Sequence, residues 1–241
     1  MSIRFFKPYI PSKYTQGLIG NIKVLVLGAS HYCIYNKKSD KFKCSEWENC
    51  TSTKIKDSSK FNETCPYYKT IKTPTKLENS TCDEIENYLA DYENYLSFNN
   101  FTQLMIEFTL LERDEIWERI AFSNYVQYFV PTIETPNQTK SDIKNFIAFL
   151  ETLNELKPDL VIIWGTKITN HFKKKYIKSM VDKLEVRNDT YFLDMVYNKN
   201  RYILINPYHP CDCRKYWSNN LNKFKSVLSD AIKEIAPNSI L

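Results

Sequence analysis

Residues 21–28 read Asn-Ile-Lys-Val-Leu-Val-Leu-Gly, a run rich in valine and leucine that ends at a glycine. A continuous apolar run of this length is typical of a strand buried on both faces, and the glycine is typical of a tight turn. The stretch therefore predicts the first strand of a parallel sheet. The residues from Gly28 to Tyr32 would then lie at the carboxyl end of that strand.

Four more segments have the apolar character of strands. They lie at residues 120–126, 160–164, 191–196 and 201–205. The last two flank a Tyr-Asn-Lys-Asn stretch and are predicted to pair as a hairpin. In open α/β sheets, ligands bind at the carboxyl ends of the strands. Polar residues that follow these strands, such as Asn124 and His209, are therefore the first candidates for a functional site.

Helices are predicted between the strands, where apolar residues recur at spacings of three and four. One begins near residue 83, and a second is expected to begin at Thr102, whose hydroxyl suits an N-cap. Others are expected at residues 141–156, 166–184 and 218–235. Strands that alternate with helices predict an α/β fold of three αβα layers with a mostly parallel central sheet.

The composition fits one large domain that spans residues 1–241. The chain has 43% hydrophobic residues, enough to bury a full core. No stretch approaches the roughly 18 consecutive apolar residues that span a bilayer, and the first residues do not resemble a signal peptide. We therefore expect a cytoplasmic protein with no membrane partner. Phe122 and Trp164 are expected in the core, and His171, on a lysine-rich segment, is expected to be solvated.

Residues 34–82 are predicted to be an insertion rich in lysine and cysteine within the domain. Ten of its residues are lysine and six are Asp or Glu, so it supplies about +4 of the net charge of +5. A basic loop attracts phosphates regardless of sequence, and it can equally be a solvated loop. Both interpretations remain open.

The cysteines suggest a metal clip, although no Cys-x-x-Cys pair is present. A structural zinc or iron-sulfur cluster would stabilise a polar insertion, and the set predicted to hold it is Cys33, Cys44, Cys50 and Cys65. The alternative is a set of unligated thiols, as expected in a reducing compartment. No cofactor is required by the other motifs.

Four motifs occur in an order that resembles the uracil-DNA glycosylase superfamily. They are Leu-Gly-Ala-Ser-His-Tyr at 27–32, the strand at 120–127 followed by Pro131, the strand at 157–165 with its terminal glycine, and Tyr-His-Pro at 208–210. The resemblance covers roughly residues 20–30 and 115–235 and implies the fold of that superfamily. It also implies a protein that binds nucleic acid, DNA rather than RNA.

The resemblance implies specific roles for the residues of these motifs. An enzyme of this kind takes a base out of the stack, reads its edge and stacks it on an aromatic ring. The Asn124 amide would read the edge, and His209 would stabilise the negative charge on the departing base. Base binding is assigned to Gly28, Ala29, His31, Tyr32, Asn124, Tyr208 and Pro210, and catalysis to His209 and Ser30.

Ser30 departs from the superfamily pattern, because members commonly carry an acidic residue at that position. A serine hydroxyl cannot serve as a general base at neutral pH. Cys211 likewise stands where serine usually follows His-Pro. Base binding is therefore better supported than excision by a hydrolase of N-glycosidic bonds. Two alternatives stay open: a non-catalytic module that binds nucleic acid or nucleotides, and a metal- or thiol-dependent enzyme centred on Cys33, His31 and Cys211.

Overall fold

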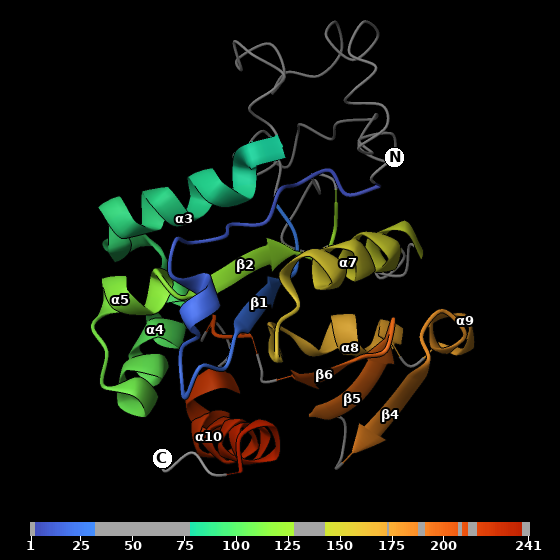
Figure 1. The fold of residues 1–241 in the computed structure, drawn as a ribbon. Coiled ribbons are helices and arrows are strands. Elements are labelled where there is room, and N and C mark those ends of the chain that lie inside the picture. Colours follow the sequence, from blue (N-terminus) through green and yellow to red (C-terminus); the bar gives the residue numbers. More distant parts are fainter. Residues whose placement is uncertain are drawn as a thin grey trace, which may run out of the picture.

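The fold is a six-stranded mixed sheet with helices packed on both of its faces (Figure 1). The computed structural model describes residues 3–31, 78–127, 143–172, 174–187, 191–206, 209–211 and 216–237. The strands are β1 (Val24–Gly28), β2 (Ile120–Asn124), β3 (Leu160–Ile163), β4 (Lys183–Arg187), β5 (Phe192–Tyr197) and β6 (Asn200–Ile205). They are ordered β2-β1-β3-β6-β5-β4.

Strands β2, β1, β3 and β6 run parallel, and β5 is antiparallel to both of its neighbours, β6 and β4. The α/β class with a mostly parallel sheet is thereby confirmed, as is the β5–β6 hairpin. All five residues of β1 are buried. Val24 and Val26 contact the core on one face, while Leu25 and Leu27 contact the core on the other. Because β1 is buried on both faces, its sequence is an unbroken apolar run and not an alternation of apolar and polar residues.

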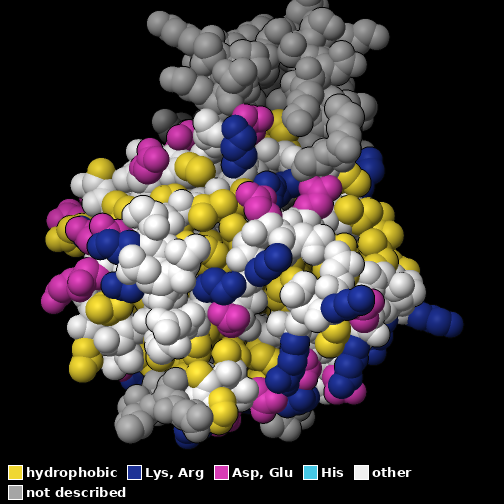
Figure 2. All heavy atoms as spheres, in the orientation of Figure 1, with side chains coloured by type: hydrophobic (Ala, Val, Ile, Leu, Met, Phe, Trp, Pro, Cys, Tyr) yellow, Lys and Arg dark blue, Asp and Glu magenta, His cyan; other side chains and the backbone are white. Residues whose placement is uncertain are grey.

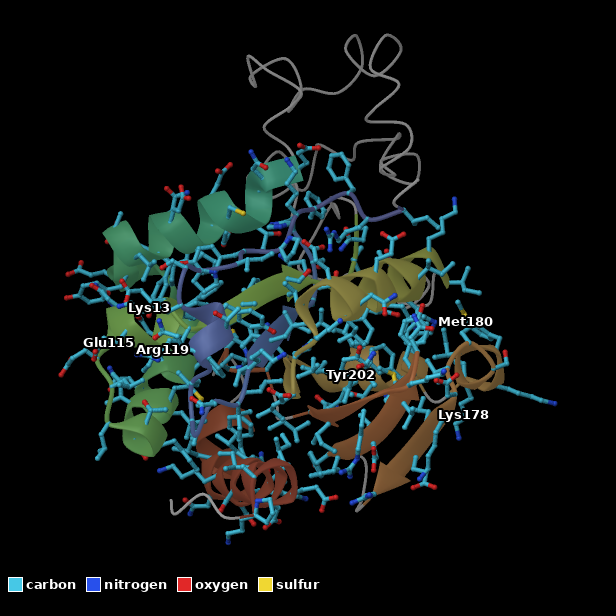
Figure 3. The ribbon with its side chains drawn as sticks, viewed as in Figure 1. Lys13, Glu115, Arg119, Lys178, Met180 and Tyr202 are labelled. Atoms are coloured by element: carbon cyan, nitrogen blue, oxygen red, sulfur yellow. The ribbon has the colours of Figure 1, made fainter. Side chains whose placement is uncertain are left out.

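Two helical layers cover the sheet. One core lies beneath α3 (Ser80–Ala90), α4 (Leu96–Thr109), α5 (Arg113–Trp117) and α10 (Tyr216–Ile235). The other lies beneath α7 (Ile143–Leu156), α8 (Thr166–Phe172) and α9 (Lys175–Lys178). Short 3₁₀ turns occur at Tyr14–Gln16 and Tyr92–Asn94. In Figure 3, Tyr202 lies between β6 and α7, where its hydroxyl donates to the Leu153 carbonyl (3.4 Å).

The predicted start of the second helix at Thr102 is wrong. Helix α4 begins at Leu96, so Thr102 lies in its middle and is buried. Its hydroxyl oxygen accepts a hydrogen bond from the Trp117 indole N–H (2.8 Å) and lies 3.0 Å from the Tyr88 hydroxyl. The side chain therefore joins α3, α4 and α5, and its polarity serves tertiary contacts rather than a cap.

The single helix expected over residues 166–184 is also wrong. Helix α8 ends at Phe172, α9 is a separate short helix, and Lys183–Arg187 form the edge strand β4. The pairing of β4 with β5 determines this conformation. Because β4 alternates charged and apolar residues and is largely exposed, it lacks the apolar run by which the other strands were recognised.

The predicted insertion is described only at its end. Helix α3 begins at Ser80, so the last three residues of the 34–82 segment belong to a core helix. Cys82 lies in its first turn, with its thiol 3.7 Å from the Pro8 carbonyl oxygen. Tyr32 and the four cysteines of the predicted metal set lie outside the described residues. Within the part of the chain that is described, no helix is both long and apolar enough to cross a membrane.

Candidate functional site

The parallel strands bring Gly28, Asn124 and His209, which are described members of the predicted site, to one end of the sheet. Gly28 is paired in register with Asn124, the last residue of β2. Strand β3 leads into Trp164 and Gly165, and His209 follows β6. The Trp164 and His209 rings lie 5.9 Å apart, edge to face. The carboxyl ends of β2, β1, β3 and β6 therefore meet here, as the sequence predicted for this class of sheet.

Gly28 is required by the close approach of β2. A Cβ atom at this position would lie 2.7 Å from Asn124 Oδ1 and 2.7 Å from the Phe122 ring. The Gly28 carbonyl accepts the Tyr125 N–H (2.9 Å), and the next carbonyl, of Ala29, accepts the Val126 N–H (3.0 Å). The loop after β1 is thus held against β2 for two further residues. Ser30 follows and is half-buried.

His31 holds the Asn124 side chain in place. The Asn124 amide nitrogen lies 2.9 Å from His31 Nε2, and the Thr81 hydroxyl lies 2.9 Å from the same nitrogen. The amide N–H is a donor only, so Nε2 accepts and the neutral ring carries its proton on Nδ1. Burial lowers the pKa of His31 to about 4. The imidazole is therefore neutral at physiological pH and fixes the orientation of the amide.

His209 is set in the opposite tautomer. Its Nδ1 accepts the backbone N–H of Cys211 (3.1 Å), so in the neutral ring the proton lies on Nε2. Pro210, which follows His209, is buried. Its carbonyl accepts a hydrogen bond from Asn100 Nδ2 of α4 (2.7 Å), which anchors the loop. A histidine that donates through Nε2 can stabilise negative charge on a ligand. Tyr208 lies outside the described residues.

Trp164 adds a second donor beside His209. Its indole is buried, and among the described residues no hydrogen-bond acceptor meets its Nε1–H. The ring packs against Phe98, Phe101 and Phe122. An unpaired buried N–H is uncommon in folded proteins and favours a position where a ligand supplies the acceptor. Trp164 is a core residue, as predicted, but the unpaired donor was not predicted.

Several supporting residues could not be found from the motifs. Gln127 donates to the Asn124 carbonyl (2.6 Å), and its Oε1 accepts the backbone N–H groups of Phe5 and Phe6 (3.0 Å each). Phe6 also packs edge to face on His31, with the ring centroids 4.5 Å apart. These partners and Thr81 come from distant parts of the chain. Only the position of Gln127 beside Asn124 in the strand motif gave a local signal.

The expectation that His171 is solvated is wrong. The residue is buried, with Nδ1 2.5 Å from the Tyr125 hydroxyl and Nε2 2.9 Å from the Tyr176 hydroxyl. Its spacing from Ile168, three residues earlier on α8, was the available signal. The contact with His171 fixes Tyr125, which follows Asn124 and points to the opposite face of the sheet.

Tyr125→Phe is expected to lower the free energy of unfolding by about 1–2 kcal/mol, because it leaves a buried imidazole nitrogen without that partner. Urea denaturation followed by circular dichroism measures the change. Tyr176→Phe is the matched control. It is expected to lower the free energy of unfolding by less, since Tyr176 is 41% exposed and water can replace its hydroxyl as the partner of His171. Equal stability of wild type and Tyr125→Phe would contradict the role given to this contact.

No group of three or more metal-binding side chains occurs within the described ranges. The hypothesis of a metal- or thiol-dependent centre included Cys33, which is outside those ranges, and His31, whose Nε2 contacts Asn124 and Thr81. No protein-family model matches the sequence, and no curated protein matches it either.

Proposed function

We propose that the carboxyl edge of β2, β1, β3 and β6 binds a flipped base of DNA, in the manner of the uracil-DNA glycosylase superfamily that the motif order resembles. The supporting observation is the convergence of an oriented amide and an imidazole donor at one edge. The amide belongs to Asn124, which His31 and Gly28 hold in one orientation. The donor is Nε2 of His209.

The chemistry of these groups suits a base better than a charged metabolite. An amide presents a donor and an acceptor in one plane, which matches the polar edge of a pyrimidine or a purine. Nε2 of His209 and the indole N–H of Trp164 are neutral donors that can meet a carbonyl oxygen of the base. Burial among aromatic rings strengthens such hydrogen bonds because the local dielectric is low.

Ser30 favours a second candidate function, a module that binds nucleic acid or nucleotides without cleaving them. Hydrolysis of the glycosidic bond needs a group that activates water, and a serine hydroxyl cannot do so at neutral pH. If excision occurs, it depends on stabilisation of the leaving base by His209. Binding without turnover would identify the second candidate.

Asn124→Ala is expected to weaken binding of DNA that contains a uracil, hypoxanthine or xanthine base by about 30-fold, or about 2 kcal/mol, through loss of the amide contacts. Fluorescence anisotropy with labelled single-stranded and duplex oligonucleotides measures the affinity. In parallel, alkaline cleavage of the same DNA detects excision, which His209→Ala should abolish.

Asn154→Ala is the matched control, since Asn154 is exposed and its side-chain oxygen accepts a hydrogen bond from the Asn198 amide, away from the candidate base site. Its affinity for DNA is expected to equal that of the wild type. An absence of binding to every oligonucleotide, or the same loss in the Asn124 and Asn154 variants, would refute the proposal.

A further inference from the structure

A groove of about 350 Å³ lies between the end of the β4–β5 pair and helix α10. Arg187 of β4, Phe192 of β5 and Tyr191, which precedes β5, form one wall. The polar residues that the helix contributes are Lys223, Ser226, Asp230 and Glu234. Basic and acidic side chains are interleaved over the lower right of Figure 2, where Figure 1 places β4. Its volume falls at the lower end of the range of small-molecule sites.

The groove lies at the same end of the sheet as the candidate base site. Phe192 is paired in register with Ile205, the last residue of β6. The carbonyl of Tyr191 accepts the N–H of Asn206 (2.9 Å), at the start of the segment that leads to His209. The groove and the base site are nevertheless formed by different residues.

Lys223 supplies a positive charge that no carboxylate of the described residues pairs with. Its ammonium lies 4.1 Å from the centre of the Tyr191 ring, and none of the described carboxylates is within ion-pair distance of it. Lys225, on the same helix, is paired with Glu107. Arg187 is likewise paired, with Asp194 (2.6 Å) and Glu234 (3.4 Å). Lys223 therefore differs from the neighbouring cations in having no carboxylate partner among the residues described.

The helix places a hydroxyl beside this ammonium. Ser226 follows Lys223 by three residues, so both side chains lie on the same face of α10. An ammonium and a hydroxyl on one face are donors suited to a phosphate group. Asp230 lies two turns after Lys223, about 10 Å from it along the helix axis, and its carboxylate can accept hydrogen bonds from sugar hydroxyls. Phe192 and Val227 provide apolar surface between these two ends.

We propose that this groove binds a nucleotide, with its phosphate on Lys223 and Ser226 and its sugar towards Asp230. The inference goes beyond base recognition at Asn124. Binding of a free nucleotide does not depend on that proposed function, whereas binding of one nucleotide of a DNA strand rests on it. The same chemistry can come from a free nucleotide or from one nucleotide of a DNA strand that is bound at the adjoining edge. Neither source requires a metal ion or a chemical step.

The test compares Lys223→Gln with Lys225→Gln in the full chain. Isothermal titration with AMP and with inorganic phosphate measures the free ligands. Anisotropy of a labelled oligonucleotide at several salt concentrations measures the strand. If the groove binds a free nucleotide, Lys223→Gln is expected to weaken the affinity for AMP about tenfold. If the groove binds one nucleotide of a DNA strand, Lys223→Gln should reduce the slope of log affinity against log salt concentration by about one.

Lys225→Gln is expected to match the wild type in every titration, because that lysine faces α4 and not the groove. Asn124→Ala should leave AMP binding unchanged, which separates failure of the groove from failure of the base site. The inference is overturned if Lys223→Gln changes neither AMP nor oligonucleotide binding. It is also overturned if the two lysine variants lose affinity equally.

Discussion

Gly28→Ala is expected to lower the free energy of unfolding by about 3 kcal/mol and to remove base binding. The added Cβ would lie 2.7 Å from Asn124 Oδ1 and from the Phe122 ring, and overpacking of this kind costs about 1–3 kcal/mol. Relief by rotation of Asn124 would break its contact with His31 and leave the buried Asn124 amide nitrogen without that partner. The loss therefore lies at the upper end of that range.

Urea denaturation of four proteins measures this effect as a double-mutant cycle: the wild type, Gly28→Ala, Asn124→Ala and the double variant. Because Asn124→Ala removes the oxygen that the new Cβ would meet, Gly28→Ala should cost about half as much in that background. Strictly additive losses would show that Gly28 and Asn124 do not restrict each other. The contact with Phe122 accounts for the cost that remains.

Stability is expected to fall by about 3 kcal/mol as the pH drops from about 6.5 to about 4, through the protonation of His31. Burial lowers the pKa of this residue from 6.5 to about 4, so the unfolded chain binds the proton more readily than the folded chain. The contribution is fully present above pH 6.5 and is lost as the pH falls towards 4. Each pKa unit corresponds to about 1.4 kcal/mol.

The difference between wild type and His31→Gln isolates this effect from other titrating groups. Among those, Asp194 has its pKa lowered by a hydrogen bond from Arg201, so its contribution is lost only at lower pH. Urea denaturation at pH 7, 5.5 and 4 should show the two proteins converging in stability as the pH falls. A constant difference across that range would show that His31 is not buried as a neutral ring.

The sequence predicted the parallel strands well because burial on both faces leaves a distinct pattern. Strand β1 and strand β3 are unbroken apolar runs, and their carboxyl ends follow directly from the pattern. Strand β4 gave no such signal, since its exposed charged residues are ordered only by pairing with β5. Thr102 was misassigned because a threonine that bonds across three helices looks the same in sequence as an N-cap.

For the candidate site, the sequence located the strand ends but not the contacts between them. Gly28 and Asn124 were identified by motif position, and their mutual contact depends on strand register. The Thr81 and Phe6 contacts with His31 join segments far apart in the chain, which no local pattern reveals. His171 was misjudged because nearby lysines obscured its position on the inner face of α8. Tyr32, Tyr208 and the cysteine set remain predictions.

The two outermost strands of the sheet, β2 and β4, are protected from pairing with other molecules in different ways. At one edge, Tyr9 pairs with Phe122 of β2 through two backbone hydrogen bonds, so the N-terminal segment covers this fully buried strand. At the other, β4 exposes Lys183 and Glu185, which form an ion pair with each other (3.1 Å). Charged side chains on an edge strand disfavour the addition of a strand from another molecule. Both arrangements disfavour the pairing of a strand from another molecule with β2 or β4.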